Sequence, residues 1–110
     1  MKRYKIEFTV SSKNDMKNMR DYILRKFKYK ELGISFTKKM RGAIDSLKQF
    51  PKGYTNVGLI YKGYYIYLKS SQGYLFFYII NEEENKITLL RVLQEGMNWR
   101  KMIEEWSVEN

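Results

Sequence analysis

Alternating apolar and polar residues open the chain. Tyr4, Ile6, Phe8 and Val10 fall on one face of an extended segment, and polar residues separate them. A period of two is typical of a strand with one buried face. The pattern predicts a strand over residues 3–10.

The period then becomes helical. Apolar residues recur three or four positions apart at Met16, Met19, Ile23 and Phe27. Ser11 and Ser12 offer an N-terminal cap, and Asp15 would place negative charge in the first turn, where the helix dipole favours it. We therefore expect a first helix over residues 13–29.

A second basic, amphipathic segment follows Gly33, which we interpret as a break between helices. Its apolar stripe consists of Phe36, Met40, Ala43, Ile44, Leu47 and Phe50. Pro51, the only proline, and Gly53 end it. Two such segments joined by a short break predict a helical hairpin, and their methionines are expected in the core.

The second half of the chain is rich in β-branched and aromatic residues, which predicts strands. We expect them at residues 57–61, 64–69, 74–81 and 87–93, separated by short polar connections. Such short loops require antiparallel neighbours. A last helix over residues 99–106 would be anchored by Trp99 and Trp106. The order β-α-α-β-β-β-β-α predicts one α+β domain over residues 1–110, with the hairpin packed on a mainly antiparallel sheet.

The composition removes several kinds of chemistry. The 110 residues include no Cys and no His. Disulfides, thiolate or imidazole metal sites and His-dependent nucleophilic catalysis are therefore excluded. Residues 1–8 begin basic without continuing into an apolar signal core, and no segment is long enough to span a membrane. We expect an unprocessed cytoplasmic protein.

The charge is unevenly distributed along the chain. Residues 1–55 contain 15 Lys/Arg and 5 Asp/Glu, a net +10, whereas residues 56–110 contain 6 and 7, a net −1. The basic half therefore predicts an acidic protein or a nucleic acid as a partner.

Three segments, in this order and at this spacing, resemble the RelE/ParE superfamily of toxins. Residues 44–51 are similar to the family's helix that ends at a proline stop, and residues 74–80 to its tyrosine-containing strand. Residues 87–99 are similar to its last strand, with Arg91 followed by an aliphatic residue and an Asn-Trp entry into a C-terminal helix. The resemblance covers nearly the whole chain.

The resemblance implies the toxin of a type II toxin–antitoxin pair, bound by a cognate antitoxin and requiring no cofactor or metal. The absent His and the tyrosine-rich strand look closer to ParE, which implies a gyrase poison that stops replication. A ribosome-dependent mRNA endoribonuclease of the RelE kind is the alternative, and an inactive homologue used for protein binding is another. Whether the chain is an enzyme therefore stays open.

Arg91 is the first candidate site residue. By alternation it shares a face with Ile87, Leu89 and Leu93, so a permanent charge interrupts an apolar row. It could contact nucleic acid or a target protein on an open sheet face, or it could form a structural ion pair.

A row of Tyr65, Tyr67 and Lys69 is expected on the face opposite Ile66 and Leu68. Such a row could bind a target or stack on bases, although cross-strand packing on a solvated face is the commoner use of tyrosine. For the nuclease alternative, Arg91, Lys62 and Lys69 would stabilise the phosphate, and a tyrosine such as Tyr67, or a lysine, would transfer the proton.

Basic residues also cluster around the turn between the helices, at Lys28, Lys30, Lys38, Lys39 and Arg41. They could bind nucleic acid or receive an acidic antitoxin segment. A solvated helix face is the plain alternative.

Overall fold

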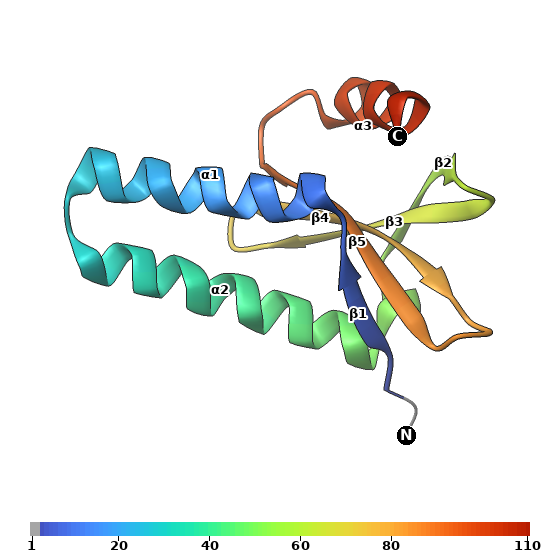
Figure 1. The fold of residues 1–110 in the computed structure, drawn as a ribbon. Helices are drawn as coiled ribbons and strands as arrows, with labels where there is room; N and C mark the ends of the chain where they lie inside the picture. The colour runs from blue at the N-terminus through green and yellow to red at the C-terminus, as the bar shows by residue number, and fades with distance from the viewer. Residues whose placement is uncertain (1–2) are drawn as a thin grey trace.

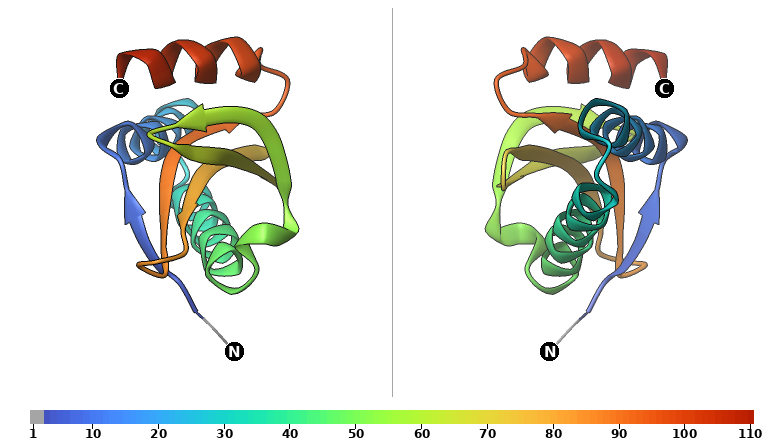
Figure 2. Two further views of the ribbon diagram at one scale, coloured as in Figure 1. Left: turned by 90° about the vertical axis from the view of Figure 1, so that its right-hand side faces the viewer. Right: turned by 90° about the vertical axis from the view of Figure 1, so that its left-hand side faces the viewer.

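The computed structural model describes residues 3–110, in which a five-stranded sheet lies between helices on its two sides (Figures 1 and 2). The elements in chain order are β1 (Lys5–Phe8), α1 (Val10–Phe27), α2 (Lys30–Gln49), a 3-10 turn (Pro51–Gly53), β2 (Thr55–Tyr61), β3 (Tyr64–Ser71), β4 (Tyr74–Asn81), β5 (Lys86–Gln94) and α3 (Trp99–Glu109). The strand order is β1-β5-β4-β3-β2, with β1 parallel to β5 and all other pairs antiparallel. The predicted α+β architecture is confirmed.

Both faces of the sheet are covered, and the sequence of β4 reflects this because the strand is apolar on both faces. Phe76, Tyr78 and Ile80 join the core beneath the helical hairpin, whereas Phe77 and Ile79 join a second core beneath α3. A strand buried on both faces carries apolar residues without alternation. The continuous apolar run of this strand follows from its position between two layers.

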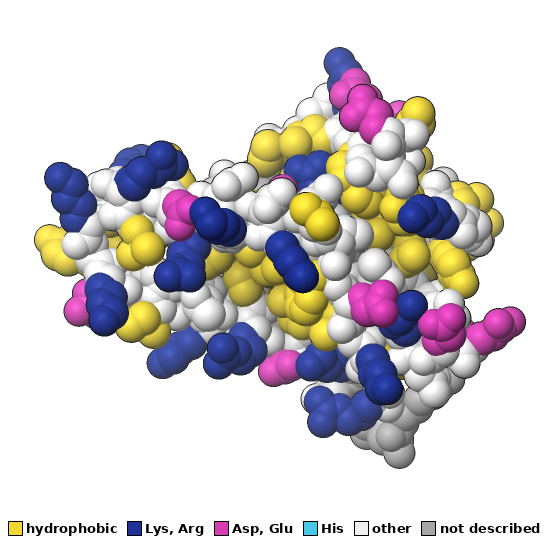
Figure 3. All heavy atoms as spheres, in the orientation of Figure 1, with side chains coloured by type: hydrophobic (Ala, Val, Ile, Leu, Met, Phe, Trp, Pro, Cys, Tyr) yellow, Lys and Arg dark blue, Asp and Glu magenta, His cyan; other side chains and the backbone are white. Residues whose placement is uncertain are grey.

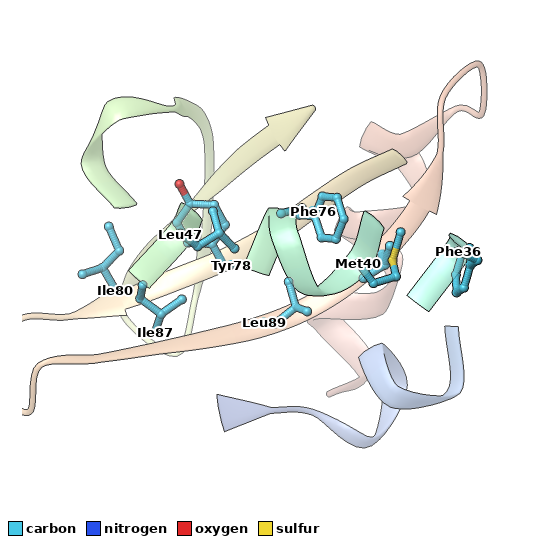
Figure 4. Close-up of a cluster of buried hydrophobic side chains, with 10 residues drawn as sticks. Phe36, Met40, Leu47, Phe76, Tyr78, Ile80, Ile87 and Leu89 are labelled. Atoms are coloured by element: carbon cyan, nitrogen blue, oxygen red, sulfur yellow. The ribbon is translucent and has the colours of Figure 1, made fainter. Parts of the chain in front are cut away.

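The larger core lies where α2 crosses the sheet. Leu47 and Met40 of α2 meet Tyr78, Phe76 and Leu89 of β4 and β5 (Figure 4). The buried Tyr78 hydroxyl donates a hydrogen bond to the carbonyl oxygen of Pro51 at 2.5 Å. This bond satisfies the only polar atom that the side chain carries into the core.

The first helix begins three residues earlier than expected. The side chain of Thr9 caps it by accepting a hydrogen bond from the backbone N–H of Ser12 at 3.0 Å. Val10 is the first helical residue and 74% exposed, so the strand pattern does not extend to it. Asp15 consequently lies beyond the first turn, and the expectation that it interacts with the helix dipole is wrong.

The break between the helices lies at Lys28 and Tyr29 rather than at Gly33. Lys28 adopts a left-handed conformation, with φ 58°, and ends α1. Gly33 is a buried residue within α2, and a Cβ added there would lie 2.9 Å from Leu24 Cδ2. Its missing side chain allows the two helices to approach closely.

Within residues 3–110, no helix is both long and apolar enough to cross a membrane.

Candidate functional site

A groove of about 380 Å³ lies between α1, the end of β5 and α3. Asp15 and Arg91 form its polar end, and the apolar part of its lining includes Met19, Met97 and Met102. The groove is open, and Met97 is 42% exposed. Flexible methionine side chains are well suited to packing against a partner of irregular shape.

Arg91 is held by Asp15 at this groove. Its Nε donates to Asp15 Oδ2 at 2.7 Å and its terminal nitrogen donates to Oδ1 at 3.0 Å. The backbone N–H of Val92 also donates to Oδ2, at 2.9 Å. The two side chains are 18% and 14% exposed. A bidentate pair of this kind fixes the guanidinium in one orientation, so its planar donor edge is directed at Asp15 rather than at solvent.

A β-bulge moves Arg91 off the face predicted for it. The pairing of β4 with β5 shifts between Phe77 and Tyr78, so that Arg91 lies opposite Phe77 and Leu89 opposite Tyr78. Residues directly opposite each other in a ladder share a face. The expectation that Arg91 shares a face with Ile87 and Leu89 is therefore wrong, because the bulge inserts one extra residue.

The row of Tyr65, Tyr67 and Lys69 is not an exposed face. Lys69 is 8% exposed, lies 4.9 Å from the ring centroid of Tyr54 and donates to the carbonyl oxygen of Ala43 at 3.4 Å. Tyr67 stacks on Tyr78 with ring centroids 5.8 Å apart. Alternation could not reveal that α2 covers this side of β3 while α3 covers the other.

Tyr65 alone of this row is largely exposed, at 55%. Lys62 lies in the turn between β2 and β3, with its ammonium 5.2 Å from the ring centroid of Tyr61. Lys69 pairs with Phe76 on the hairpin face of the sheet, whereas Arg91 pairs with Phe77 on the other face. The four candidate nuclease residues are therefore not brought together. No cluster of three or more acidic side chains in residues 3–110 could hold a metal ion.

An exposed apolar strip, which the sequence did not reveal, runs along one side of the hairpin. Tyr22, Phe27 and Leu32 are 46%, 47% and 39% exposed. They line a second groove of about 420 Å³, which shares Tyr22 and Gln94 with the first. The apolar strip, defined as Tyr22, Phe27, Leu32 and Met97, therefore borders two adjoining grooves. Helical periodicity placed Phe27 in the apolar stripe of the first helix, yet its side chain is largely exposed. Tyr22 and Leu32 lie beside the apolar stripes of their helices, and Met97 lies in the connection between β5 and α3.

Comparisons with known proteins identify the family. Residues 6–99 match the family described as the ParE toxin of type II toxin–antitoxin system, parDE. The chain belongs to the ParE toxin family. No match was found among curated proteins.

Two solved structures share the ParE toxin fold with this chain. One is described as the chromosomal ParDE system from P. aeruginosa, with a TM-score of 0.66, 11% identity, and coverage of 84% of this chain and 96% of that one. The other is the RelBE2 toxin–antitoxin complex from Mycobacterium tuberculosis, with a TM-score of 0.57, 17% identity and coverage of 84% and 99%. At these identities the likeness concerns the fold.

In this ParE-family chain the five basic residues expected to receive an antitoxin are divided between two sides of the hairpin. Lys30, Lys38 and Arg41 line a groove between α1 and α2 together with Arg20. Lys39 instead lines the depression beside the apolar strip. Lys28 lies at the turn between the helices. The cluster seen in the sequence is therefore two separate surfaces.

Proposed function

We propose that residues 1–110 form a single toxin domain that stops growth by binding DNA gyrase and blocking replication, and that an antitoxin neutralises it. The observation that carries the proposal is the dispersal of the candidate nuclease residues in a chain that belongs to the ParE toxin family. Arg91 is bound by Asp15, and Lys69 is buried on the opposite face of the sheet.

RNA cleavage needs charge stabilisation and proton transfer at one phosphate. A lysine beneath α2 and an arginine already bound by a carboxylate cannot meet at such a phosphate without rearrangement of the sheet. A poison that acts by docking has no such requirement. The geometry therefore supports a binding mode of action over the ribonuclease alternative.

The antitoxin is proposed to bind along the apolar strip. Tyr22, Leu32 and Met97 border two adjoining grooves, whose exposed apolar side chains suit the apolar face of an amphipathic helix. Lys39 beside it would attract acidic residues flanking that face. The net charge of +9 favours an acidic partner as well.

The target is tested by expressing the chain from a tightly controlled promoter and following DNA and protein synthesis separately by pulse labelling. We expect DNA synthesis to fail first, and the purified chain to inhibit gyrase supercoiling. Early arrest of translation with cleaved messages would instead establish the ribonuclease alternative. Normal growth with both syntheses unchanged would identify an inactive homologue.

The antitoxin surface is tested with two substitutions two residues apart in α2. Leu32→Glu places a charge in the apolar strip, whereas Ile34→Glu changes a comparably exposed aliphatic residue that lines the other groove. Burial of a leucine contributes about 1.5–3 kcal/mol, so Leu32→Glu should weaken binding of the product of the adjacent reading frame at least about tenfold. Equal effects of the two variants would contradict this site.

A further inference from the structure

The groove between α1 and α2, on the side of the hairpin away from the apolar strip, is strongly basic. Arg20, Lys30, Lys38 and Arg41 line a depression of about 400 Å³, together with Leu24, Gly33, Ile34 and Thr37. No acidic residue lines it. On the face of the hairpin seen in Figure 3, Lys and Arg side chains gather along both helices with few acidic side chains among them.

The four cations are exposed and available to a ligand. None of them forms a salt bridge or a side-chain hydrogen bond within residues 3–110. Asp21, the nearest acidic neighbour of Arg20 in α1, is bound by Lys17 at 2.8 Å. Lys17 therefore already engages the Asp21 carboxylate, and the same hydrogen bond lowers the pKa of Asp21.

The helices arrange these charges as a row of three on α2 that faces a single arginine on α1. Lys30, Lys38 and Arg41 fall within about a quarter of the circumference of α2 and extend along it for about 16 Å. Arg20 faces them from α1, because Gly33 lets the helices approach closely enough for both to border one groove. A row of about 16 Å equals the rise of roughly five base pairs along the axis of a DNA duplex.

We propose that this basic groove binds the phosphate backbone of duplex DNA. The lining contains no aromatic residue, whereas single-stranded nucleic acids are usually held by stacking on aromatic rings. An amphipathic protein helix needs a row of apolar anchors, and such a row lies on the other side of the hairpin. Preference for DNA over RNA rests on the proposed function, since a toxin bound to gyrase would lie beside duplex DNA.

The test is fluorescence anisotropy of the purified full chain with a labelled 20-base-pair DNA duplex over a range of salt concentrations. Gyrase is absent from this measurement, so a failure of the chain to bind DNA would not contradict the proposal that gyrase is the target. The variant carries Lys30→Gln, Lys38→Gln and Arg41→Gln. The control carries Lys5→Gln, Lys13→Gln and Lys101→Gln, which remove the same amount of charge at exposed positions outside the groove.

We expect the groove variant to lose at least about tenfold in affinity at low salt. Each lost phosphate contact should reduce the slope of log K against log salt by about 1, so the total reduction is about 2–3. The control should keep the slope of the unmodified chain. Equal losses in both variants would mean that only net charge matters and would overturn the proposal.

Three further outcomes would also overturn it. The first is the absence of DNA binding by the unmodified chain at low salt. The second is tighter binding of an RNA duplex of the same sequence, and the third is displacement of DNA by poly-glutamate at equal charge concentration. Either of the last two would assign the groove to a different ligand.

Discussion

The indole Nε1 of Trp106 donates a hydrogen bond to the Ser11 hydroxyl oxygen at 2.8 Å, joining α3 to the first turn of α1 across 95 residues of sequence. The Trp106 ring also lies against Tyr61, with centroids 5.0 Å apart. These contacts hold α3 against both the sheet and the hairpin.

Replacement of this indole separates its two contributions to stability. Trp106→Phe should cost about 1 kcal/mol, because it removes the hydrogen bond while keeping most of the buried area. Trp106→Ala should cost about 3–5 kcal/mol through loss of packing beneath α3. Urea denaturation followed by circular dichroism measures both. A Trp106→Ala effect no larger than that of Trp106→Phe would show that α3 contributes little to the fold.

The Asp15–Arg91 pair should be a structural bond between α1 and β5. Asp15→Ala would leave the guanidinium and the Val92 N–H without their acceptor, which should cost about 2–4 kcal/mol in the free energy of unfolding. A double-mutant cycle with Arg91→Ala should give a coupling energy of about 1–3 kcal/mol. Asp21→Ala, which breaks the exposed pair with Lys17, is the control and should leave the melting temperature unchanged. A coupling energy near zero would mean that the arginine is held by other contacts.

The two glycines of α2 should respond differently to alanine. At Gly42 an added Cβ would meet nothing within 4 Å, so Gly42→Ala should stabilise the protein by about 0.5–1 kcal/mol. At Gly33 the Cβ would lie 2.9 Å from Leu24 Cδ2, which must move aside. Gly33→Ala should therefore stabilise less than Gly42→Ala or destabilise. Thermal unfolding distinguishes the two, and an equal gain at both sites would show that the helices separate freely.

Alkaline pH should unfold the protein partly through Tyr78. Burial raises the pKa of Tyr78 above its ordinary value of 10.0, so the folded state keeps a proton that the unfolded state loses. The contribution of Tyr78 to the free energy of unfolding is complete below pH 10. Above pH 10 it declines by about 1.4 kcal/mol per pH unit. Burial also raises the pKa of Tyr74 and acts in the same direction.

The measurement is a series of urea denaturations between pH 9 and pH 11. Tyr78→Phe should lower stability by about 1–3 kcal/mol at pH 7, because the Pro51 carbonyl loses its donor, and should flatten the decline above pH 10. An unchanged slope in this variant would assign the alkaline transition to other groups.

Local periodicity predicted the elements well, because each strand and helix buries a face that its own sequence marks. β4 was predicted with the bounds that the structure shows, since turn residues delimit a continuous apolar run. Val10 was misassigned because it continues the alternation of β1, although Thr9 already caps α1. The boundary between a strand and a helix is hard to locate from the sequence when the capping residue, here Thr9, directly follows the strand.

The candidate site was harder to predict because it depends on contacts between distant segments. Asp15, the partner of Arg91, lies 76 residues away in the sequence. The face of the sheet on which Arg91 lies depends on a β-bulge that no local sequence pattern predicts. Lys69 was expected to be exposed because alternation predicted that only one face of β3 is buried. In the structure helices cover both faces of the sheet. The apolar strip and the basic groove arise from how the two helices are rotated against each other, which only packing determines.

The parallel pairing of β1 with β5 also determines when the sheet of the toxin can be completed during its synthesis. Lys5 pairs with Lys86, so the first strand to be synthesised has no partner until the last strand is made. At typical elongation rates this interval is on the order of 4–16 s. The hairpin can form during that time, but α1 has neither β5 nor Arg91 to hold it. A chain that stops short of β5 should therefore be an inert fragment, so that activity begins only when translation is almost complete.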